Sequence, residues 1–253
     1  MTNAMIGVTL ISIASAMVGT YIVTRRMVFI SGGITHACFG GLGLGYYLGV
    51  SPMLMATLFA VGGSLGVERL SRGGARRDSA IAVIWALGMA LGILFIFMTH
   101  GFVPELNTFL FGNVLTITDA DLWSFAALTG GMTCFYLLFY RLIVAVSFDQ
   151  DFARTRNLPV GWINVAMTVL VALTIVMTIR MIGIMLLMSL VSLPQMIAER
   201  FTRRYLPLML TSVGVSLTGC IGGLWLAYAI SVPASASIVL LLVGLYALSA
   251  LKR

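Results

Sequence analysis

Residues 160–198 read VGWINVAMTVLVALTIVMTIRMIGIMLLMSLVSLPQMIA and contain one charged side chain, Arg180. An apolar run of about 20 residues is long enough to cross a bilayer as a helix. This stretch is almost twice that length, so it predicts two membrane-spanning helices with a tight connection near Ile179 and Arg180. Arg180 is then expected to extend to the membrane interface. Pro194 is expected to break or kink the second helix near its end.

The rest of the chain has the same apolar character. Of its 253 residues, 60% are hydrophobic and 9% are charged, and the mean hydropathy is +1.07. A soluble domain carries about 25% charged residues, so the polar surface here is too small to cover a particle in water. We therefore predict an all-α polytopic transmembrane bundle of about nine helices, or eight, with no room for a soluble domain. The apolar runs lie near 5–24, 30–49, 52–68, 79–99, 121–146, 160–179, 181–198, 205–230 and 235–251.

The net charge of +7 is distributed unevenly along the chain. All Lys and Arg residues except Arg180 fall in alternate connections between the predicted spans, near the end of a span that leads into such a connection (Arg141), or after the last span (Lys252 and Arg253). By the positive-inside rule these connections lie in the cytoplasm, which places the N-terminus outside and the C-terminus inside. The alternation favours membrane lipid over nucleic acid as the partner of the basic residues. They are Arg25, Arg26, Arg69, Arg72, Arg76, Arg77, Arg141, Arg154, Arg156, Arg200, Arg203, Arg204, Lys252 and Arg253.

The opposite connections carry Glu105, Asp119 and Asp121, a candidate acidic point at which a cation enters from outside. The chain between His100 and Asp121 is too long for a tight turn and too apolar for a free loop. Non-helical backbone at membrane depth needs protein cover, so a short interfacial or re-entrant helix is expected there. The N-cap position of a helix favours residues whose side-chain oxygen can accept hydrogen bonds from the free backbone N–H groups of the first turn. Thr118 or Asp119 is therefore expected to cap the following helix, and Asp78 the helix that begins near residue 79.

His36 lies within the apolar run 30–49. Ionisable side chains are costly in a membrane and usually face a cavity or a partner, which makes them functional hypotheses by default. Four glycines share the helical face of His36 and leave backbone and open space beside the imidazole. We hypothesise that His36 lines a translocation pathway or contacts a metal ion and that these glycines form the pathway wall. Helix packing, a polar network and gating by protonation are the alternatives. The four glycines are Gly32, Gly33, Gly40 and Gly43.

A second stripe of small residues runs along the same predicted helix. Its members are Ala37, Gly41, Gly45 and Gly49, spaced by four residues. Small residues at this spacing allow another helix to approach closely in a membrane. The stripe therefore predicts helix packing on one side of the helix, with the His36 face open on another.

The sequence carries no nucleotide-binding P-loop and no zinc-protease motif. No GxxxxGK[ST] or HExxH is present, so an energised process would need ATP to be handled by another chain. The only two histidines, His36 and His100, cannot make a multi-histidine zinc site alone. Two alternatives to a transporter are a polytopic membrane enzyme and a scaffold. The enzyme would use His36 or His100 as acid or base with Glu105, Asp119 or Asp121.

The segment 148–159 reads FDQDFARTRNLP and is the most distinctive polar stretch. It predicts a short amphipathic helix in a cytoplasmic loop. Asp149 can cap its start, and Asn157 can adopt the left-handed conformation that ends it. The segment is either an ordinary linker or a docking surface for a cytosolic partner.

This segment resembles the coupling segment of permease subunits of zinc, manganese and iron ABC importers, the ABC-3 metal permease family. Members often show Phe-Asp-x-Glu-Phe-Ala-Arg-x-x-Gly-Leu-Pro. The matching residues are Phe148, Asp149, Phe152, Ala153, Arg154, Leu158 and Pro159, with Asp151 in place of Glu and Asn157 in place of Gly. Other counterparts follow in order along the chain: Arg25-Arg26 with Thr35-His36-Ala37, Asp78-Ser79-Ala80-Ile81, Leu110-Phe111-Gly112, Ile182-Gly183, Leu193-Pro194 and Arg203-Arg204.

The resemblance implies one transmembrane permease domain over 1–253, of the ABC importer permease type, whose segment 148–159 couples it to an ATPase. It implies a homodimer in a prokaryotic cytoplasmic (inner) membrane, two cytosolic ATP-binding subunits and an extracytoplasmic metal-binding protein. No cofactor is expected to bind tightly, because the divalent metal is substrate and ATP binds the partner subunit. Many members carry an aspartate four residues before the histidine, where this chain has Gly32. That departure leaves the identity of the transported substrate open between zinc, manganese, iron and a larger metal chelate.

Overall fold

The computed structural model describes residues 2–99, 112 and 117–251, and within these ranges the chain forms helices and no strands. The expected helix between residues 100 and 116 and the side chain of Glu105 lie outside the described residues. The predicted all-helical bundle is confirmed. The nine helices of the described ranges are α1 (Thr2–Thr24), α2 (Phe29–Leu48), α3 (Pro52–Arg72), α4 (Arg77–Met98), α6 (Asp119–Phe148), α7 (Gln150–Thr155), α8 (Val160–Ala198), α9 (Tyr205–Ile230) and α10 (Ala234–Leu251).

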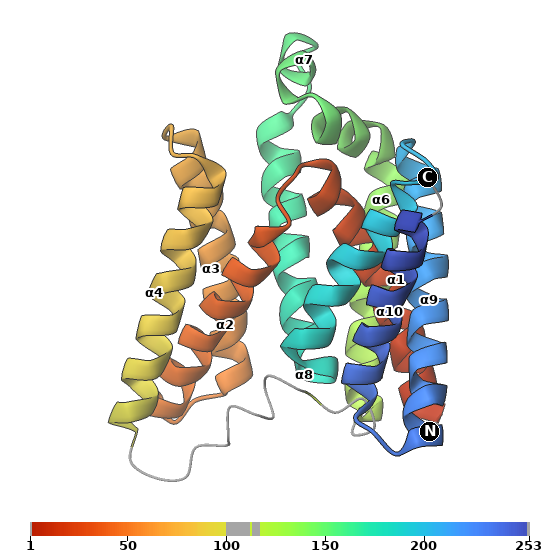
Figure 1. The fold of residues 1–253 in the computed structure, drawn as a ribbon. Coiled ribbons are helices and arrows are strands. Elements are labelled where there is room, and N and C mark those ends of the chain that lie inside the picture. The colour runs from red at the N-terminus through yellow and green to blue at the C-terminus, as the bar shows by residue number, and fades with distance from the viewer. Residues whose placement is uncertain (1, 100–111, 113–116, 252–253) are drawn as a thin grey trace. The chain divides into compact units, whose positions relative to one another are not determined.

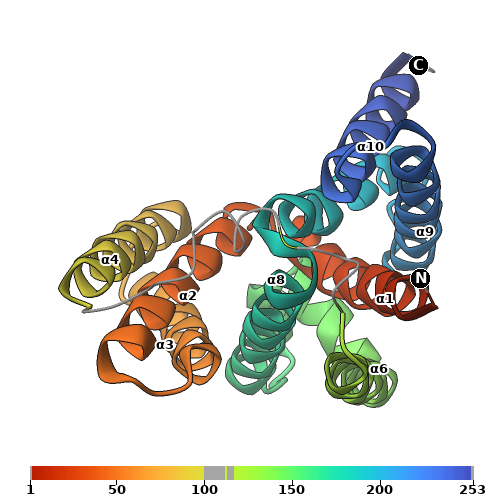
Figure 2. The same ribbon diagram turned by 90° about the horizontal axis from the view of Figure 1, so that it is seen from below.

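The helices divide into two compact units. One draws its described residues from Met1–Arg26, Leu106–Phe148 and Met177–Arg253, and so contains α1, α6, the later part of α8, α9 and α10. The other draws them from Met27–Glu105 and Asp149–Val176, and so contains α2, α3, α4, α7 and the first part of α8. In the second unit, α2 packs against both α3 and α4, as Figures 1 and 2 show. The site residues on α2 and α7 therefore belong to the same unit.

Seven of the described helices are long and apolar enough to cross a membrane, namely α1, α3, α4, α6, α8, α9 and α10. The predicted span 30–49 forms α2 but is not among these seven. Its many glycines, with Thr35 and His36, dilute its apolar character. Thirteen residues of α2 are buried, so protein rather than lipid covers most of this helix, and it needs less hydrophobic surface than a helix that faces lipid.

The predicted pair of helices over 160–198 is present, but their junction lies at Gly183 rather than at Ile179 and Arg180. Gly183 has φ 78° and ψ 173°, a backbone conformation that only glycine adopts readily. Gly112, itself at φ 55°, packs on this break so closely that a Cβ there would meet the backbone of Ile182 and Gly183. Two glycines therefore make the break, and Arg180 remains inside the first helix.

Pro194 is predicted to break or kink its helix; the break does not occur, because α8 continues to Ala198, and the kink stays a prediction. A proline cannot donate to the carbonyl of the residue four before it, which here is Leu190. The side-chain Nε2 of Gln195 donates to that carbonyl at 3.3 Å and to the carbonyl of Ser15 at 3.2 Å. A neighbouring amide thus replaces the hydrogen bond that Pro194 removes.

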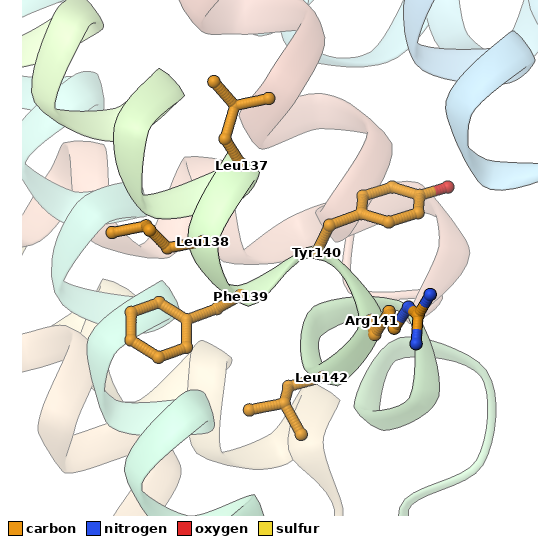
Figure 3. A pocket seen from close by; sticks show the side chains of 6 residues that line it. All are labelled: Leu137, Leu138, Phe139, Tyr140, Arg141 and Leu142. Carbon is orange, nitrogen blue, oxygen red and sulfur yellow. The ribbon is translucent and has the colours of Figure 1, made fainter.

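Helix α6 has a break of a different kind. Phe139 leaves helical geometry with φ −111° and ψ 16°, which any residue can adopt. Figure 3 shows the backbone unwound at this point and the surface hollow beside it. The hollow has a volume of about 260 Å³, and its lining residues are Leu137, Leu138, Phe139, Tyr140, Arg141 and Leu142.

The helix starts test the predicted caps. Thr118 Oγ1 accepts from the backbone N–H of Asp121 at 3.2 Å, and Asp121 Oδ2 accepts from the backbone N–H of Thr118 at 3.3 Å. This reciprocal pair confirms Thr118 as the cap of α6. The prediction for Asp78 is wrong: α4 begins at Arg77, and Asp78 lies within its first turn. A carboxylate there still interacts favourably with the helix dipole.

Candidate functional site

The glycine face that contains His36 lies against α4. A Cβ at Gly40 would meet the backbone of Gly88, and a Cβ at Gly43 would meet the backbone of Gly92. Conversely, a Cβ at Gly88 would collide with the carbonyl of His36 itself. Backbones at such separations require glycine on both helices. The face predicted to be an open pathway wall is therefore occupied by α4 at Gly40 and Gly43.

The same holds at the start of this face. A Cβ at Gly33 would lie 2.8 Å from a side-chain methyl of Ile81 on α4, and Gly32 is buried. The space expected beside the imidazole is also filled. The ring of His36 stacks on the indole of Trp85, with centroids 4.4 Å apart and planes 24° apart. His36 is nevertheless only partly buried, so part of this residue stays accessible in this chain.

The second small-residue stripe of α2 lies against α3. A Cβ at Gly41 would meet the backbone of Met55 and Ala56, and one at Gly45 would lie 2.6 Å from the Cα of Pro52. Ala37 contributes its methyl group to the same side, close to Gly63 of α3. Gly49 has a different role, because it is the C-cap of α2 at φ 66° with no atom near its missing side chain. Helix α2 is thus covered on both small-residue faces.

Helix α7 forms within the segment 148–159, as predicted. The Oδ1 of Asp149 accepts from the backbone N–H groups of Asp151 at 3.0 Å and Phe152 at 2.9 Å, which confirms it as the N-cap. Asn157 follows the helix at φ 54°, the left-handed conformation predicted for it. Local residue chemistry therefore fixes both limits of this short helix.

The exposure of this segment separates the residues that could touch a partner from those that could not. Phe148 and Phe152 are 58% and 54% exposed, so both apolar rings are available to a partner. Ala153 is 0% exposed and packs within the chain, so it is not part of a docking surface. The other exposed residues of the predicted coupling set are Asp149, Asp151, Arg154, Asn157 and Pro159, and Leu158 is partly buried.

The two described acidic residues of the candidate cation entrance already have partners. Asp119 Oδ1 accepts from the Nδ2 of Asn3 at 2.7 Å. Asp121 pairs with Arg180 at 2.9 Å and has a side chain 13% exposed. A cation that used Asp121 would have to displace Arg180. The interfacial position predicted for Arg180 is thus accompanied by an ion pair.

The described residues contain no group of three or more His, Cys, Asp or Glu side chains that could hold a metal ion. Sequence reasoning also missed two groups that surround the candidate site. Trp85 was hidden in an apolar run, where nothing marks an indole as the neighbour of a histidine. A buried amide, Asn164, bonds to Gln150 of α7. The sequence could have indicated Asn164, since it is an amide side chain within an otherwise apolar span.

Comparisons with known proteins place the chain among transporters. A sequence model of the ABC 3 transport family matches residues 1–253. A probable metal transport system membrane protein of Chlamydia pneumoniae is 35% identical over 238 residues, which cover 91% of this chain and 81% of the relative. The manganese transport system membrane protein MntC of Halalkalibacterium halodurans is 29% identical, over 98% of this chain and 85% of the relative. Among solved structures, PsaBC from Streptococcus pneumoniae in complex with Fab is similar with a TM-score of 0.84 and 25% identity, covering 98% of this chain and 90% of that one.

Proposed function

Because the chain belongs to the ABC 3 transport family, we propose that it is the membrane permease of an importer for a divalent transition metal, either zinc, manganese or iron. A separate subunit hydrolyses the ATP. The full-length family match carries this proposal. Two metal transport proteins that are similar over more than nine-tenths of the chain support a metal ion as the substrate. One of them is a manganese transport protein.

Helix α7 is the proposed contact with the ATP-hydrolysing subunit. It presents the exposed ring of Phe152 between the charged side chains of Asp151 and Arg154. An apolar anchor within a polar rim is the usual composition of a protein–protein contact. Phe148 extends the same segment on its N-terminal side.

The proposed assembly is a homodimer of permease chains, each forming one transmembrane domain over 1–253. Two cytosolic ATP-binding subunits and an extracytoplasmic metal-binding protein complete it. The alternation of basic connections places the segment 148–159 and the C-terminus in the cytoplasm and the N-terminus outside. In this orientation, Asp119 and Asp121 lie at the outer side, where metal would arrive.

We propose His36 as a contact for the metal on its path. Imidazole is a common ligand of transition metals, and a single ligand binds weakly enough to release the ion. The importer of a larger metal chelate is the less favoured alternative. The glycine face that would have left room for a chelate packs against α4 at Gly33, Gly40 and Gly43.

Uptake into proteoliposomes tests the transport proposal. The permease is reconstituted with its ATPase, and ATP-dependent uptake is measured for manganese, zinc, iron and chelated iron. We expect uptake of at least one free ion, little competition from the chelate, and no uptake when the ATPase is omitted. Uptake that persists without any ATPase would contradict the proposal.

The variant His36→Ala tests the pathway contact. We expect uptake to fall about tenfold, which corresponds to about 1.4 kcal/mol of lost interaction with the ion. Trp85→Leu is the matched comparison, because it removes the stacking ring but keeps the imidazole, and we expect a smaller loss. Unchanged uptake and metal selectivity in a well-assembled His36→Ala protein would exclude the contact.

A further inference from the structure

A chain of hydrogen bonds between side chains joins α7 to three membrane helices. Gln150 of α7 accepts at Oε1 from Arg77 Nη2 of α4 at 3.3 Å. Its Nε2 donates to Asn164 Oδ1 of α8 at 3.0 Å. The Nδ2 of Asn164 then donates to Glu68 Oε1 of α3 at 3.4 Å. All four residues belong to one compact unit.

The chain is anchored at its far end by a second cation. Arg72 of α3 donates through Nε to Glu68 Oε1 at 3.2 Å and through Nη2 to the carbonyl of Gly161 on α8 at 3.4 Å. We call Arg77, Gln150, Asn164, Glu68 and Arg72 the polar network. It contains one amide from α7 and one from α8 between a guanidinium and a carboxylate.

The chemistry of the two ends fixes the direction of every bond between them. A guanidinium can only donate and an ionised carboxylate can only accept. Gln150 must therefore turn its oxygen to Arg77 and its nitrogen to Asn164, and Asn164 must turn its nitrogen to Glu68. Each amide thus has one orientation that satisfies both neighbours, which makes the network specific for the arrangement of the four helices.

Burial makes this arrangement costly to break. Asn164 is 3% exposed, and the Glu68 side chain is 14% exposed. A buried amide that loses its partner pays the desolvation cost of the unpaired group. Helix α7 cannot move away from α8 and α4 without leaving such groups behind. The network therefore favours movement of α7 together with these helices.

Helix α4 extends the connection to the candidate site. Arg77 lies in its first turn, and Trp85 and Gly88 lie further along the same helix, where they contact His36. A helix transmits displacement along its axis as a rigid element. The path from α7 to His36 thus consists of one hydrogen bond, between Gln150 and Arg77, then helix α4 and its close backbone contact with His36.

We infer that the polar network positions the docking helix α7 on α3, α4 and α8, so that a partner's pull on α7 is carried to the helix that contacts His36. Gln150, Asn164 and Glu68 act as positioning residues and contact neither metal nor ATP. The inference rests on the proposed function for its consequence in transport. The anchoring itself does not depend on which substrate is moved.

A paired substitution tests the direction of the bonds. In Asn164→Asp, the residue loses its donor and places a second carboxylate beside Glu68. Adding Glu68→Gln restores the hydrogen bond between positions 164 and 68 with donor and acceptor exchanged. The new amide nitrogen at position 68 donates to the aspartate, and the amide oxygen still accepts from Arg72. We expect amide exchange of residues 150–155 to accelerate about tenfold in the single variant and to return to within about threefold of the natural protein in the double variant.

Transport gives the second measurement. With the ATPase present, we expect manganese transported per ATP hydrolysed to fall about tenfold in Asn164→Asp and to recover in the double variant. Gln150→Met removes both central bonds at a partly exposed position, where misfolding is less of a concern, and should show the same fall. Ser64→Ala is the control. It removes a buried hydroxyl one turn from Glu68 that bonds only within α3, to Val61 at 2.8 Å.

The outcomes separate the two proposals. Exchange at residues 150–155 that is unchanged in Asn164→Asp and Gln150→Met, or a double variant no better than the single, overturns the network as a positioning device. Accelerated exchange with unchanged transport per ATP overturns its role in coupling. If the unsubstituted complex transports neither manganese, zinc nor iron, the proposed function fails, while the exchange measurement, made on the permease alone, still decides the anchoring.

Discussion

Helices α2 and α7 are held in the same unit by opposite means. Helix α2 lies against its neighbours through backbone contacts at Gly40, Gly41 and Gly88, where no side chain would fit. Helix α7 is held through the side chain of Gln150, which bonds to Arg77 and Asn164. One contact depends on the absence of atoms and the other on the direction of hydrogen bonds.

The difference has consequences for what each region tolerates. A contact between glycine backbones cannot accommodate an added side chain, because any added carbon meets backbone atoms that cannot rotate away. A hydrogen-bonded contact accepts a new residue if donors and acceptors are exchanged in pairs. We therefore expect the glycine faces of α2 to be sensitive to the size of a substituted side chain. We expect the contact of α7 with α4 and α8 to be sensitive to the polarity of a substituted side chain.

The largest effect is expected at Gly88. A Cβ there would collide with the carbonyl of His36 and approach the Cα of Ala37 to 2.7 Å. Gly88→Val should therefore destabilise the permease by about 3 kcal/mol, measured as the midpoint of unfolding in mixed micelles. Gly62→Ala on α3 is the control, since no atom lies within 4 Å of its missing side chain. A Gly88→Val protein as stable as the control would show that α2 and α4 are not packed through their backbones.

A smaller and local effect is expected at Asp149. The substitution Asp149→Ala removes the acceptor for two backbone N–H groups at the start of α7. Loss of such a cap costs about 1 kcal/mol, so amide exchange at Asp151 and Phe152 should accelerate while the unfolding midpoint of the whole protein stays unchanged. Asp149→Asn retains an oxygen acceptor and should restore the protection. Equal protection in the alanine variant would mean that tertiary contacts alone hold α7.

The smallest effect on the fold is expected for the ion pair between Asp151 and Arg154. Its side chains are 92% and 62% exposed, and the contact is 3.4 Å long. Exposed pairs of this kind contribute less than about 0.5 kcal/mol, so Asp151→Asn should leave the amide exchange of α7 unchanged. If the same variant weakens binding of the ATPase in a co-purification assay, the loss belongs to the contact with the partner. Altered exchange would instead assign Asp151 a part in folding α7.

The sequence predicted the features that depend on neighbours along the chain. Asp149 and Asn157 limit α7 where expected, and Thr118 caps α6. Helical periodicity also separated the two small-residue faces of α2. It could not say what covers a face, so the open space assigned beside His36 is occupied by Trp85. Ala153 was likewise grouped with the docking residues although it is buried.

The positions of the helix breaks show the same limit. Pro194 has the stronger local signal, yet Gln195 supplies the missing donor and the helix continues. The break falls at Gly183, where Gly112 from a distant part of the chain packs on the backbone. A local rule gives the tendency of a residue, and the contacts around it decide whether the tendency is expressed.

By itself, the sequence determined that this protein is a polytopic helical membrane protein with a short capped helix at 150–155, because hydrophobic run length and capping chemistry are properties of consecutive residues. Only the tertiary structure decided that α2 is covered on both small-residue faces, that His36 stacks on Trp85, and that Gln150 is joined through Asn164 to Glu68. These contacts connect residues far apart in the chain. Helical periodicity shows which residues share a face of a helix, but it does not show which other element packs against that face.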